Sequence, residues 1–268
     1  MKITLVESQA PALAPWLIGY LGSEIAPGGD PVRRVIPARP NSFIQIILAG
    51  DHSLVDAETG QHRAVPAVAL FGPLPHYRYD MDIQDELRTF SIRLQPAAAG
   101  QLFGLDPVSL IDNFVPIDLP PGLLAGLTEA PDWAAMAPLV DAWLGELAKG
   151  KLVRDPVADA ASELRERHGQ AGINELADAA NVSLRQFQRR FRNLTGLSPK
   201  LYARICRISH AVHRKQLSPD MAWTAVAQDA GYSDQSHFIR DFKALTGVLP
   251  KNFLRGQTPI ERHPRWRD

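Results

Sequence analysis

The last hundred residues contain the same pattern twice. Each copy has a run of small residues, a turn, two phenylalanines four residues apart and a Thr-Gly step; the phenylalanine pairs are Phe187/Phe191 and Phe238/Phe242. The offset between the copies is 50 residues before the turn and 51 after it, so one copy has one inserted residue. A short helix, a tight turn and a second helix form a helix-turn-helix, whose second helix enters the DNA major groove. The repeat predicts two such units, at about 173–195 and 223–246.

The turns of both copies carry the residue types that the arrangement requires. Asn181 and Gly231 occupy matching positions, and Asn and Gly best tolerate a left-handed backbone. Ser183 and Asp234 follow, where an N-cap side chain accepts a hydrogen bond from an unpaired backbone N–H group. Because both phenylalanines of a pair lie on one helix face, we expect them in the core and the opposite face in solvent.

The outward faces of the two second helices are basic and polar. On the first helix they are Arg185, Gln188, Arg189 and Arg192, and on the second Gln235, Ser236, Ile239, Arg240 and Lys243. Arginine suits guanine, glutamine suits adenine and isoleucine can contact a thymine methyl group; Arg192 and Lys243 are assigned to phosphates. The alternative is that both are solvated faces of surface helices, which is harder to sustain for two matched copies than for one.

A long helix is predicted between the two copies, from Pro199 to about Leu217. Its apolar stripe is Leu201, Ile205, Ile208 and Val212. About 18 residues of helix span roughly 27 Å. A rod of that length could hold the two reading helices close to one DNA turn, about 34 Å, apart.

The charges and prolines divide the chain near residue 150. Residues 1–150 carry 9 Lys+Arg and 17 Asp+Glu, a balance of −8, and hold 16 of the 22 prolines; residues 151–268 carry 20 and 12, a balance of +8. A basic half joined to an acidic half is typical of one module that faces phosphates and another that does not. We therefore predict a sensor or dimerisation domain over 1–150 and a DNA-binding domain over 151–268, with a linker at 150–156.

The first 120 residues have the pattern of a small barrel or sandwich. Short apolar runs between turn residues predict strands at 42–49, 64–71, 88–94 and 113–117. Helical spacing then predicts one or two helices between Asp132 and Lys149, with Pro138 in a first turn or at a break. Their apolar stripe could pack on the same domain or on a second copy. The fold class is α+β and multidomain: a mainly-β barrel with a trailing helix, then an all-α double helix-turn-helix domain.

Residues from about Ile173 to Arg255 resemble the DNA-binding domain of the AraC/XylS family of transcription regulators. The matching strings are Val182–Phe191, Gly196–Pro199 and Gly231–Phe238 with Arg240-Asp241-Phe242. The family implies an N-terminal sensing or dimerisation domain, often a cupin-like barrel. The segments Ser42–Ile46, Phe71–Pro73 and Phe90–Arg93 are similar to the N-terminal domains of one subgroup.

The N-terminal domain is expected to hold a small organic effector in an apolar pocket. Gln45 and Arg93 each interrupt an apolar strand, so they are the candidate polar anchors, although both could instead point to solvent. The competing class is a cupin-like metal-dependent enzyme fused to the DNA-binding module. His52, His62 and His76 are too well separated for a metal cluster, and neither a nucleophile elbow nor a phosphate-binding loop is present. We expect no enzyme activity, metal or cofactor.

Taken together, the sequence predicts a sequence-specific regulator that binds double-stranded DNA. A homodimer, a small organic effector and RNA polymerase are the further candidate partners. The single cysteine, Cys206, excludes an intramolecular disulfide. No apolar segment reaches the roughly 18 residues needed to span a membrane, and the absence of a secretory signal predicts a cytoplasmic, soluble protein.

Overall fold

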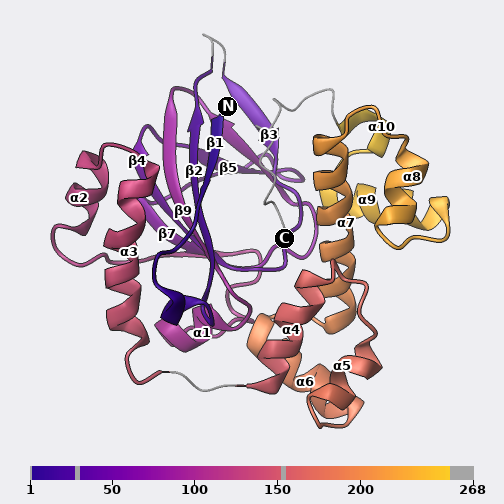
Figure 1. Ribbon diagram of the computed structural model, residues 1–268. Helices are drawn as coiled ribbons and strands as arrows, with labels where there is room; N and C mark the ends of the chain where they lie inside the picture. Colours follow the sequence, from indigo (N-terminus) through magenta and orange to yellow (C-terminus); the bar gives the residue numbers. More distant parts are fainter. Residues whose placement is uncertain (1, 28–30, 152–154, 254–268) are drawn as a thin grey trace.

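The computed structural model describes residues 2–27, 31–151 and 155–253 (Figure 1). A strand-rich part comes first in the chain and a helical part follows, so the predicted order of the two fold types is confirmed. Residues 152–154 of the expected linker lie outside the described residues. Residues 254–268, which include the C-terminal tail, also lie outside them. Within the described ranges, no helix combines the length and the apolar character needed to cross a lipid bilayer.

Two antiparallel sheets form the N-terminal part. The larger sheet has the strand order β1 (Lys2–Val6), β2 (Leu17–Ile25), β9 (Leu87–Leu94), β4 (Phe43–Ala49), β7 (Val68–Phe71) and β10 (Phe114–Pro116). The smaller one has the order β3 (Val32–Val35), β8 (Tyr79–Ile83), β5 (Ser53–Asp56) and β6 (His62–Ala64). This is the barrel-like arrangement that the short apolar runs predicted.

Alternation along the central strands assigns each side chain to one of two cores. Ile44 and Ile46 of β4 are fully buried on the face that packs against a long helix. Phe43 and Ile47, on the other face, belong to apolar clusters that also include residues of the smaller sheet. The space between the sheets is therefore filled by side chains from both.

The long helix is α3 (Trp133–Ala148), and its apolar stripe packs on its own sheet. Met136, Val140 and Leu144 are buried there, while Asp141 accepts a hydrogen bond from the Tyr20 hydroxyl at 2.5 Å. The prediction for Pro138 was wrong, because α3 continues through it: the proline lies in the second turn, on the exposed side. The shorter helical elements of this part are η1 (Pro11–Leu13), α1 (Ala98–Phe103) and α2 (Leu123–Glu129).

The C-terminal part is helical throughout and has one continuous core. Its helices are α4 (Pro156–Glu166), α5 (Ile173–Ala179), α6 (Leu184–Thr195), α7 (Pro199–Leu217), α8 (Trp223–Asp229), α9 (Gln235–Thr246) and α10 (Pro250–Phe253). The two predicted phenylalanine pairs are almost completely buried and belong to the same apolar cluster as Ile205 and Ile208 of α7. The connecting helix, α7, begins at Pro199 and ends at Leu217, as the sequence predicted.

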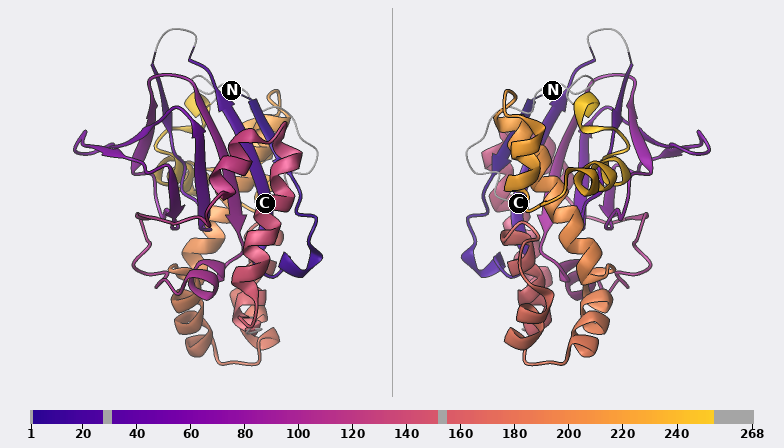
Figure 2. Two further views of the ribbon diagram at one scale, coloured as in Figure 1. Left: turned by 90° about the vertical axis from the view of Figure 1, so that its left-hand side faces the viewer. Right: turned by 90° about the vertical axis from the view of Figure 1, so that its right-hand side faces the viewer.

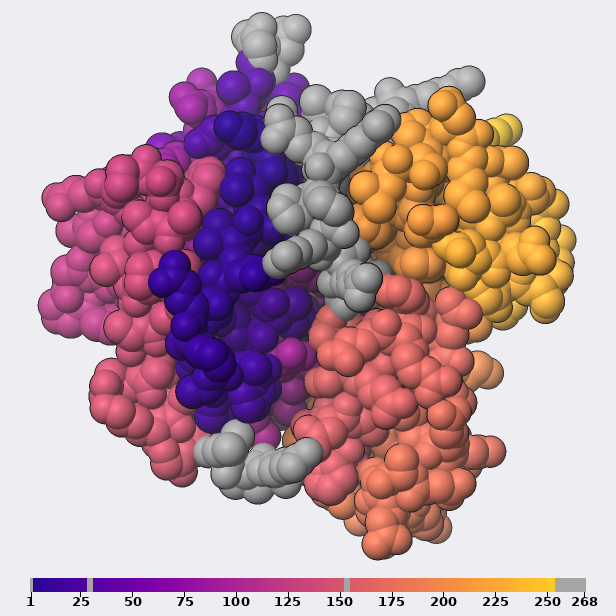
Figure 3. Space-filling model, viewed as in Figure 1, coloured from indigo at the N-terminus to yellow at the C-terminus, as the bar shows by residue number. Residues whose placement is uncertain are grey.

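Helix α7 runs along the flank of the strand-rich part that lies opposite α3 (Figures 1 and 2). Helices α5 and α6 sit at one end of α7, and α8 and α9 sit at the other (Figure 1). In the space-filling view the two helical units protrude from this flank as separate lobes (Figure 3). The fold therefore presents both second helices on the same side of the molecule as the connecting helix.

The two parts touch at the end of α9 and along α7. The backbone N–H groups of Ala38 and Tyr77 donate to the carbonyl oxygens of Leu245 and Ala244, at 2.7 and 3.1 Å. The Tyr202 hydroxyl of α7 donates to Asn41 at 2.6 Å. Ala38 is itself buried in the helical core, although it belongs to the N-terminal part of the chain. The strand-rich part therefore holds the second unit through main-chain hydrogen bonds.

Candidate nucleic-acid interface

The first reading helix, α6, begins with a complete capping box. Ser183 accepts a hydrogen bond from the Gln186 N–H group, and the Gln186 side chain accepts one from the Ser183 N–H group at 3.1 Å. Asn181 has the left-handed backbone that its position predicted, with φ of 53°. These bonds satisfy helix-end donors and fix where α6 starts. The Gln186 side chain forms part of this cap, so we do not count it among the DNA-contacting side chains.

The second reading helix, α9, starts in an equivalent way. Gly231 has φ of 77°, and the Asp234 carboxylate accepts a hydrogen bond from the Ser236 N–H group at 2.9 Å. Asp234 therefore caps α9 as predicted. The inserted residue lies in this turn and leaves the phenylalanine pair in register with that of α6.

All eight predicted DNA-contacting side chains are exposed on the two reading helices: Arg185, Gln188, Arg189, Arg192, Gln235, Ser236, Arg240 and Lys243. Within the described part of the chain, no ion pair engages any of the five cations in this set. The four residues of α6 line one groove of about 1030 Å³. These charges therefore face solvent, where a phosphate or a base edge can meet them.

Three other residues of the reading helices have roles that differ from a simple basic face. Ile239 was predicted to face outward, but it is only half exposed and packs against the helical core. The Arg190 side chain is bound to Asp155 at 2.8 Å. Leu184, which the sequence analysis did not select, is 41% exposed and lines the groove beside Arg185. Its position at the first residue of the helix was the signal that could have identified it.

A buried carboxylate fixes α9 against the connecting helix. Asp241 accepts hydrogen bonds from Arg204 of α7 at 2.6 and 3.1 Å and from the Tyr232 hydroxyl at 3.0 Å. Burial by itself would raise the pKa of Asp241, but the hydrogen bonds from Arg204 and Tyr232 outweigh it and lower the pKa. The ion pair between Arg204 and Asp241 therefore fixes how α9 packs against α7.

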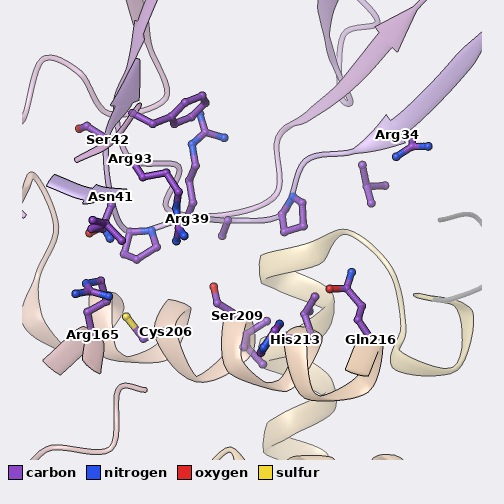
Figure 4. A pocket seen from close by; sticks show the side chains of 18 of the residues that line it. Arg34, Arg39, Asn41, Ser42, Arg93, Arg165, Cys206, Ser209, His213 and Gln216 are labelled. Atoms are coloured by element: carbon purple, nitrogen blue, oxygen red, sulfur yellow. The ribbon is translucent and has the colours of Figure 1, made fainter. Parts of the chain in front are cut away.

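The N-terminal candidates Gln45 and Arg93 lie in different places. The Gln45 side chain pairs with Nε2 of His52 at 2.9 Å, and burial lowers the pKa of His52 to about 4. Arg93 lines a cavity of about 400 Å³ between the strand-rich part and α7 (Figure 4), and Gln45 is not among its lining residues. The effector role of both residues stays a prediction. Among the described residues, no three His, Cys, Asp or Glu side chains come together as a metal site.

The cavity has walls from both parts of the chain. Arg34, Arg39 and Arg93 come from the strand-rich side, Arg165 comes from α4, and Cys206, Ser209 and His213 come from α7 (Figure 4). The remaining lining is mostly apolar and includes Val35, Met81 and Val212. This cavity therefore lies at the boundary between the two parts, and an effector pocket enclosed by residues 1–120 alone stays a prediction.

Comparison with known proteins identifies the helical part. Residues 176–256 match the family model described as a helix-turn-helix domain. The chain is 35% identical over 82 residues to the transcriptional activator RhaS of Pectobacterium carotovorum, which covers 31% of this chain and 29% of that one. It is 28% identical over 220 residues to RhaS of Escherichia fergusonii, covering 78% of this chain and 64% of that one. The chain thus spans under a third of the first relative's length.

Among solved structures, ToxT from Vibrio cholerae has a similar fold over nearly its whole length. One ToxT structure has a TM-score of 0.55 at 11% identity and covers 89% of this chain and 99% of ToxT. A second, with an unsaturated fatty acid bound to ToxT, has a TM-score of 0.51 at 11% identity and covers 90% and 96%. At this identity the likeness concerns the fold alone. The described residues therefore have a two-part fold similar to that of ToxT, and the match of residues 176–256 to the helix-turn-helix family model coincides with the helical part.

Proposed function

We propose that this protein is a transcription regulator that binds specific sequences in double-stranded DNA and responds to a small organic ligand. One observation carries the proposal: two capped reading helices, joined by one core, expose cations at matched positions, Arg189 with Arg240 and Arg192 with Lys243, and one glutamine each beside them. Helix α7 has 19 residues and so a length of about 29 Å at 1.5 Å per residue. That length suits reading helices in successive major grooves, about 34 Å apart.

The residue roles follow from the chemistry of base edges and phosphates. We assign base contacts to Arg185, Gln188 and Arg189 on α6 and to Gln235, Ser236 and Arg240 on α9. We assign phosphate contacts to Arg192 and Lys243, which lie nearer the ends of their helices. We add Leu184 to the base-contacting residues, because an exposed apolar side chain at the start of a reading helix can contact a thymine methyl group.

The ligand-dependent part of the proposal rests on the cavity between the two parts. Its volume of about 400 Å³ lies within the range of small-molecule sites. ToxT, which has the same fold, has been crystallised with an unsaturated fatty acid. A homodimer and a contact with RNA polymerase belong to the same proposal; Leu124 and Leu139, exposed on α2 and α3, are the apolar side chains available to a second copy.

Selection of binding sites from a pool of random duplexes tests the DNA-reading function directly. We expect two enriched sequence blocks about one helical turn, roughly 10 base pairs, apart. The Arg167→Ala variant is the matched control, because Arg167 is an exposed arginine that lies outside both reading helices and pairs with Glu163 and Glu175. It should select the parent sequence. A pool with no enriched sequence would contradict the proposed function.

A further inference from the structure

Each reading helix ends on a glycine that the strand-rich part covers. Gly196 follows α6 and Gly247 follows α9, both in the left-handed region, with φ of 81° and 78°. A Cβ atom added to Gly196 would lie 2.7 Å from the carbonyl oxygen of Pro107. At Gly247 the added atom would lie 2.5 Å from the Tyr77 ring. Gly104 ends α1 in the same conformation, but apart from its own chain neighbours no described residue comes within 4 Å of its Cβ position. The covered caps therefore do not follow from the capping conformation alone.

The covering residues belong to two loops of the strand-rich part. Tyr77 lies in the loop of residues 72–78, between β7 and β8. Pro107 lies in the loop of residues 104–113, between α1 and β10, and the side chain of Ile111 from the same loop also reaches the end of α6. Both reading helices therefore contact the strand-rich part at equivalent positions of the two repeats.

Close main-chain contacts hold these two loops together. The Asp112 N–H group donates to the Pro73 carbonyl at 3.1 Å, and the Gly72 N–H group donates to the Asn113 carbonyl at 3.0 Å. A Cβ atom at Gly72 would lie 1.9 Å from the carbonyl oxygen of Leu110, so a larger residue would force the loops apart. The two loops therefore form one unit, which we call the loop pair, and the positions of its two contacts with the reading helices are not independent.

The loop pair connects the two units along a route separate from α7. Figure 1 shows α6 and α9 at opposite ends of α7. Gly196 lies in the short connection 196–198 between α6 and α7, so a contact there acts at the point about which the first unit could turn on α7. The end of α9 has a further restraint, because the main chain of Tyr77 donates to Ala244 at 3.1 Å. The loop pair thus opposes rotation of either unit relative to the other, in addition to the restraint from α7 and the shared core.

The relative position of the reading helices decides which DNA sites both can occupy at once. One base pair added between two half-sites moves the second by about 3.4 Å along the duplex axis and turns it by about 34° around that axis. Two reading helices held in one arrangement lose contacts after such a change, whereas two units that can rotate recover part of them.

We propose that the loop pair fixes the relative position of α6 and α9 and so sets the spacing of the DNA half-sites that the protein accepts, with Tyr77, Pro107 and Ile111 as its positioning residues. The proposal rests on the DNA-reading function above and assigns part of the specificity to residues outside both reading helices.

Binding to duplexes of altered spacing tests the proposal on the full-length protein. The selected half-sites are placed one base pair closer, at the selected spacing and one base pair further apart, and fluorescence anisotropy measures the affinities. We expect the parent to lose about tenfold or more in affinity at either altered spacing. Tyr77→Ala combined with Ile111→Ala should reduce this loss to about threefold or less, because both side chains that cover the caps are shortened. Affinity for each half-site alone, which does not require the second unit, should change by less than about threefold.

Two controls separate positioning from a general loss of stability. Tyr77→Phe keeps the ring against Gly247 and loses only the hydroxyl that donates to Asp80 at 2.9 Å, so it should keep the spacing preference of the parent. Phe103→Ala also removes a half-buried ring from the strand-rich part, but that ring packs on Trp143 of α3. It should lower stability without changing the spacing preference.

A second variant acts on the loop pair without changing a residue that covers a cap. The added Cβ atom of Gly72→Ala would push the loops apart at Leu110, so the accepted spacing should shift or broaden. Gly145→Ala is the matched control, because outside its own helix no described residue lies within 4 Å of the Cβ position of Gly145. A spacing preference that neither Gly72→Ala nor the double variant changed would overturn the proposal.

Distances between spin labels on the two reading helices test the loop pair without DNA. Labels at the exposed positions Gln188→Cys and Ser236→Cys should give one narrow distance distribution in the parent and a broader one in the double variant. Cys206 is buried, and a sample without the introduced cysteines checks that it stays unlabelled. Equally narrow distributions would contradict the restraint by the loop pair. Absence of any sequence preference in the parent would instead remove the proposed function, while the label distances would still decide whether the loop pair holds the reading helices.

Discussion

The two helix-turn-helix units share one apolar core, and a side-chain N-cap begins the second helix of each. They differ in the charge of their reading faces and in how they contact the strand-rich part. The reading face of α6 carries three arginines and a glutamine, whereas that of α9 carries one arginine, one lysine, a glutamine and a serine. The end of α9 is hydrogen-bonded to the strand-rich part, while the end of α6 meets it by packing, with the Pro107 carbonyl against Gly196. From this difference we expect the first unit to supply more of the proposed DNA affinity and the second to be more tightly coupled to the strand-rich part.

The largest expected effect tests whether the two units are one folding unit. Phe187→Ala and Phe238→Ala each remove a fully buried ring from the common cluster, so each should cost about 3–5 kcal/mol. Because the cluster is continuous, either change should lower the stability of both units in a single urea transition. Glu58→Ala, at an exposed loop position after β5, is the control and should change stability by less than about 0.5 kcal/mol. Two separate urea transitions would show that the two units unfold independently.

The next effect compares the matched base-reading arginines, Arg189 and Arg240. Arg189→Ala should cost about 1–3 kcal/mol of binding free energy and relax the preference at one or two base pairs. Arg240→Ala should cost less, because the α9 face has fewer cationic neighbours. Fluorescence anisotropy on the selected site and on single-base variants measures both. If Arg189→Ala kept the affinity and selectivity of the parent, the assigned reading face of α6 would be wrong.

Removing the strand-rich part should affect the second unit more than the first. A fragment from Asp155 to Asp268 loses the Ala38 and Tyr77 donors to α9, and each hydrogen bond contributes about 0.5–1.5 kcal/mol. We expect the fragment to fold, to bind DNA weakly, and to lose affinity mainly for the α9 half-site. If residues 1–150 form a dimer, the intact chain gains further on paired sites through effective concentration. Equal affinities of fragment and intact chain on a double site, with both monomeric in sedimentation, would contradict the dimer.

The phosphate-contacting cations allow a narrower comparison. Arg192→Ala and Lys243→Ala should weaken binding to all sequences alike and should each reduce the slope of log K against log salt by about 1. Titrations at four or five salt concentrations, with Arg167→Ala as the control, measure this slope. If the loss of affinity in either variant depended on the DNA sequence, that residue would contact bases rather than phosphates.

The smallest effect is an acid sensitivity of the common transition that originates in the second unit. The folded state lowers the pKa of Asp241, so this group contributes stability above its unfolded value of about 3.9. That contribution is lost as the pH falls through the lower folded value. Arg204, Tyr232 and His237 are the groups that face the carboxylate. Urea unfolding over this pH range should show a steeper decline for the parent than for Asp241→Asn. The matched position of the first unit is Arg190, which stays charged throughout. Parallel profiles would show that the pair does not control stability there.

Local features of both helix-turn-helix units were predictable from the sequence. The left-handed backbone at Asn181 and Gly231, the caps at Ser183 and Asp234, and the burial of both phenylalanine pairs all depend on neighbours a few residues away. Ile239 shows where this reasoning fails: helical spacing placed it outward, but contact with the core decides its burial. Pro138 fails for a related reason, because the packing of α3 on the sheet maintains a helix that the proline alone would weaken.

The sequence by itself determined the order of the strand-rich and helical parts, the two reading helices and most of the polar side chains that they expose. Periodicity and capping are short-range properties, so one chain read in order is enough to find them. Only the tertiary structure decided that Arg39, Arg93 and Arg165 surround one cavity and that Ala38 and Tyr77 hold the end of α9. These residues are far apart in the chain, and their proximity depends on how the two parts dock. Docking is set by the shape and packing of whole surfaces, which no local pattern encodes.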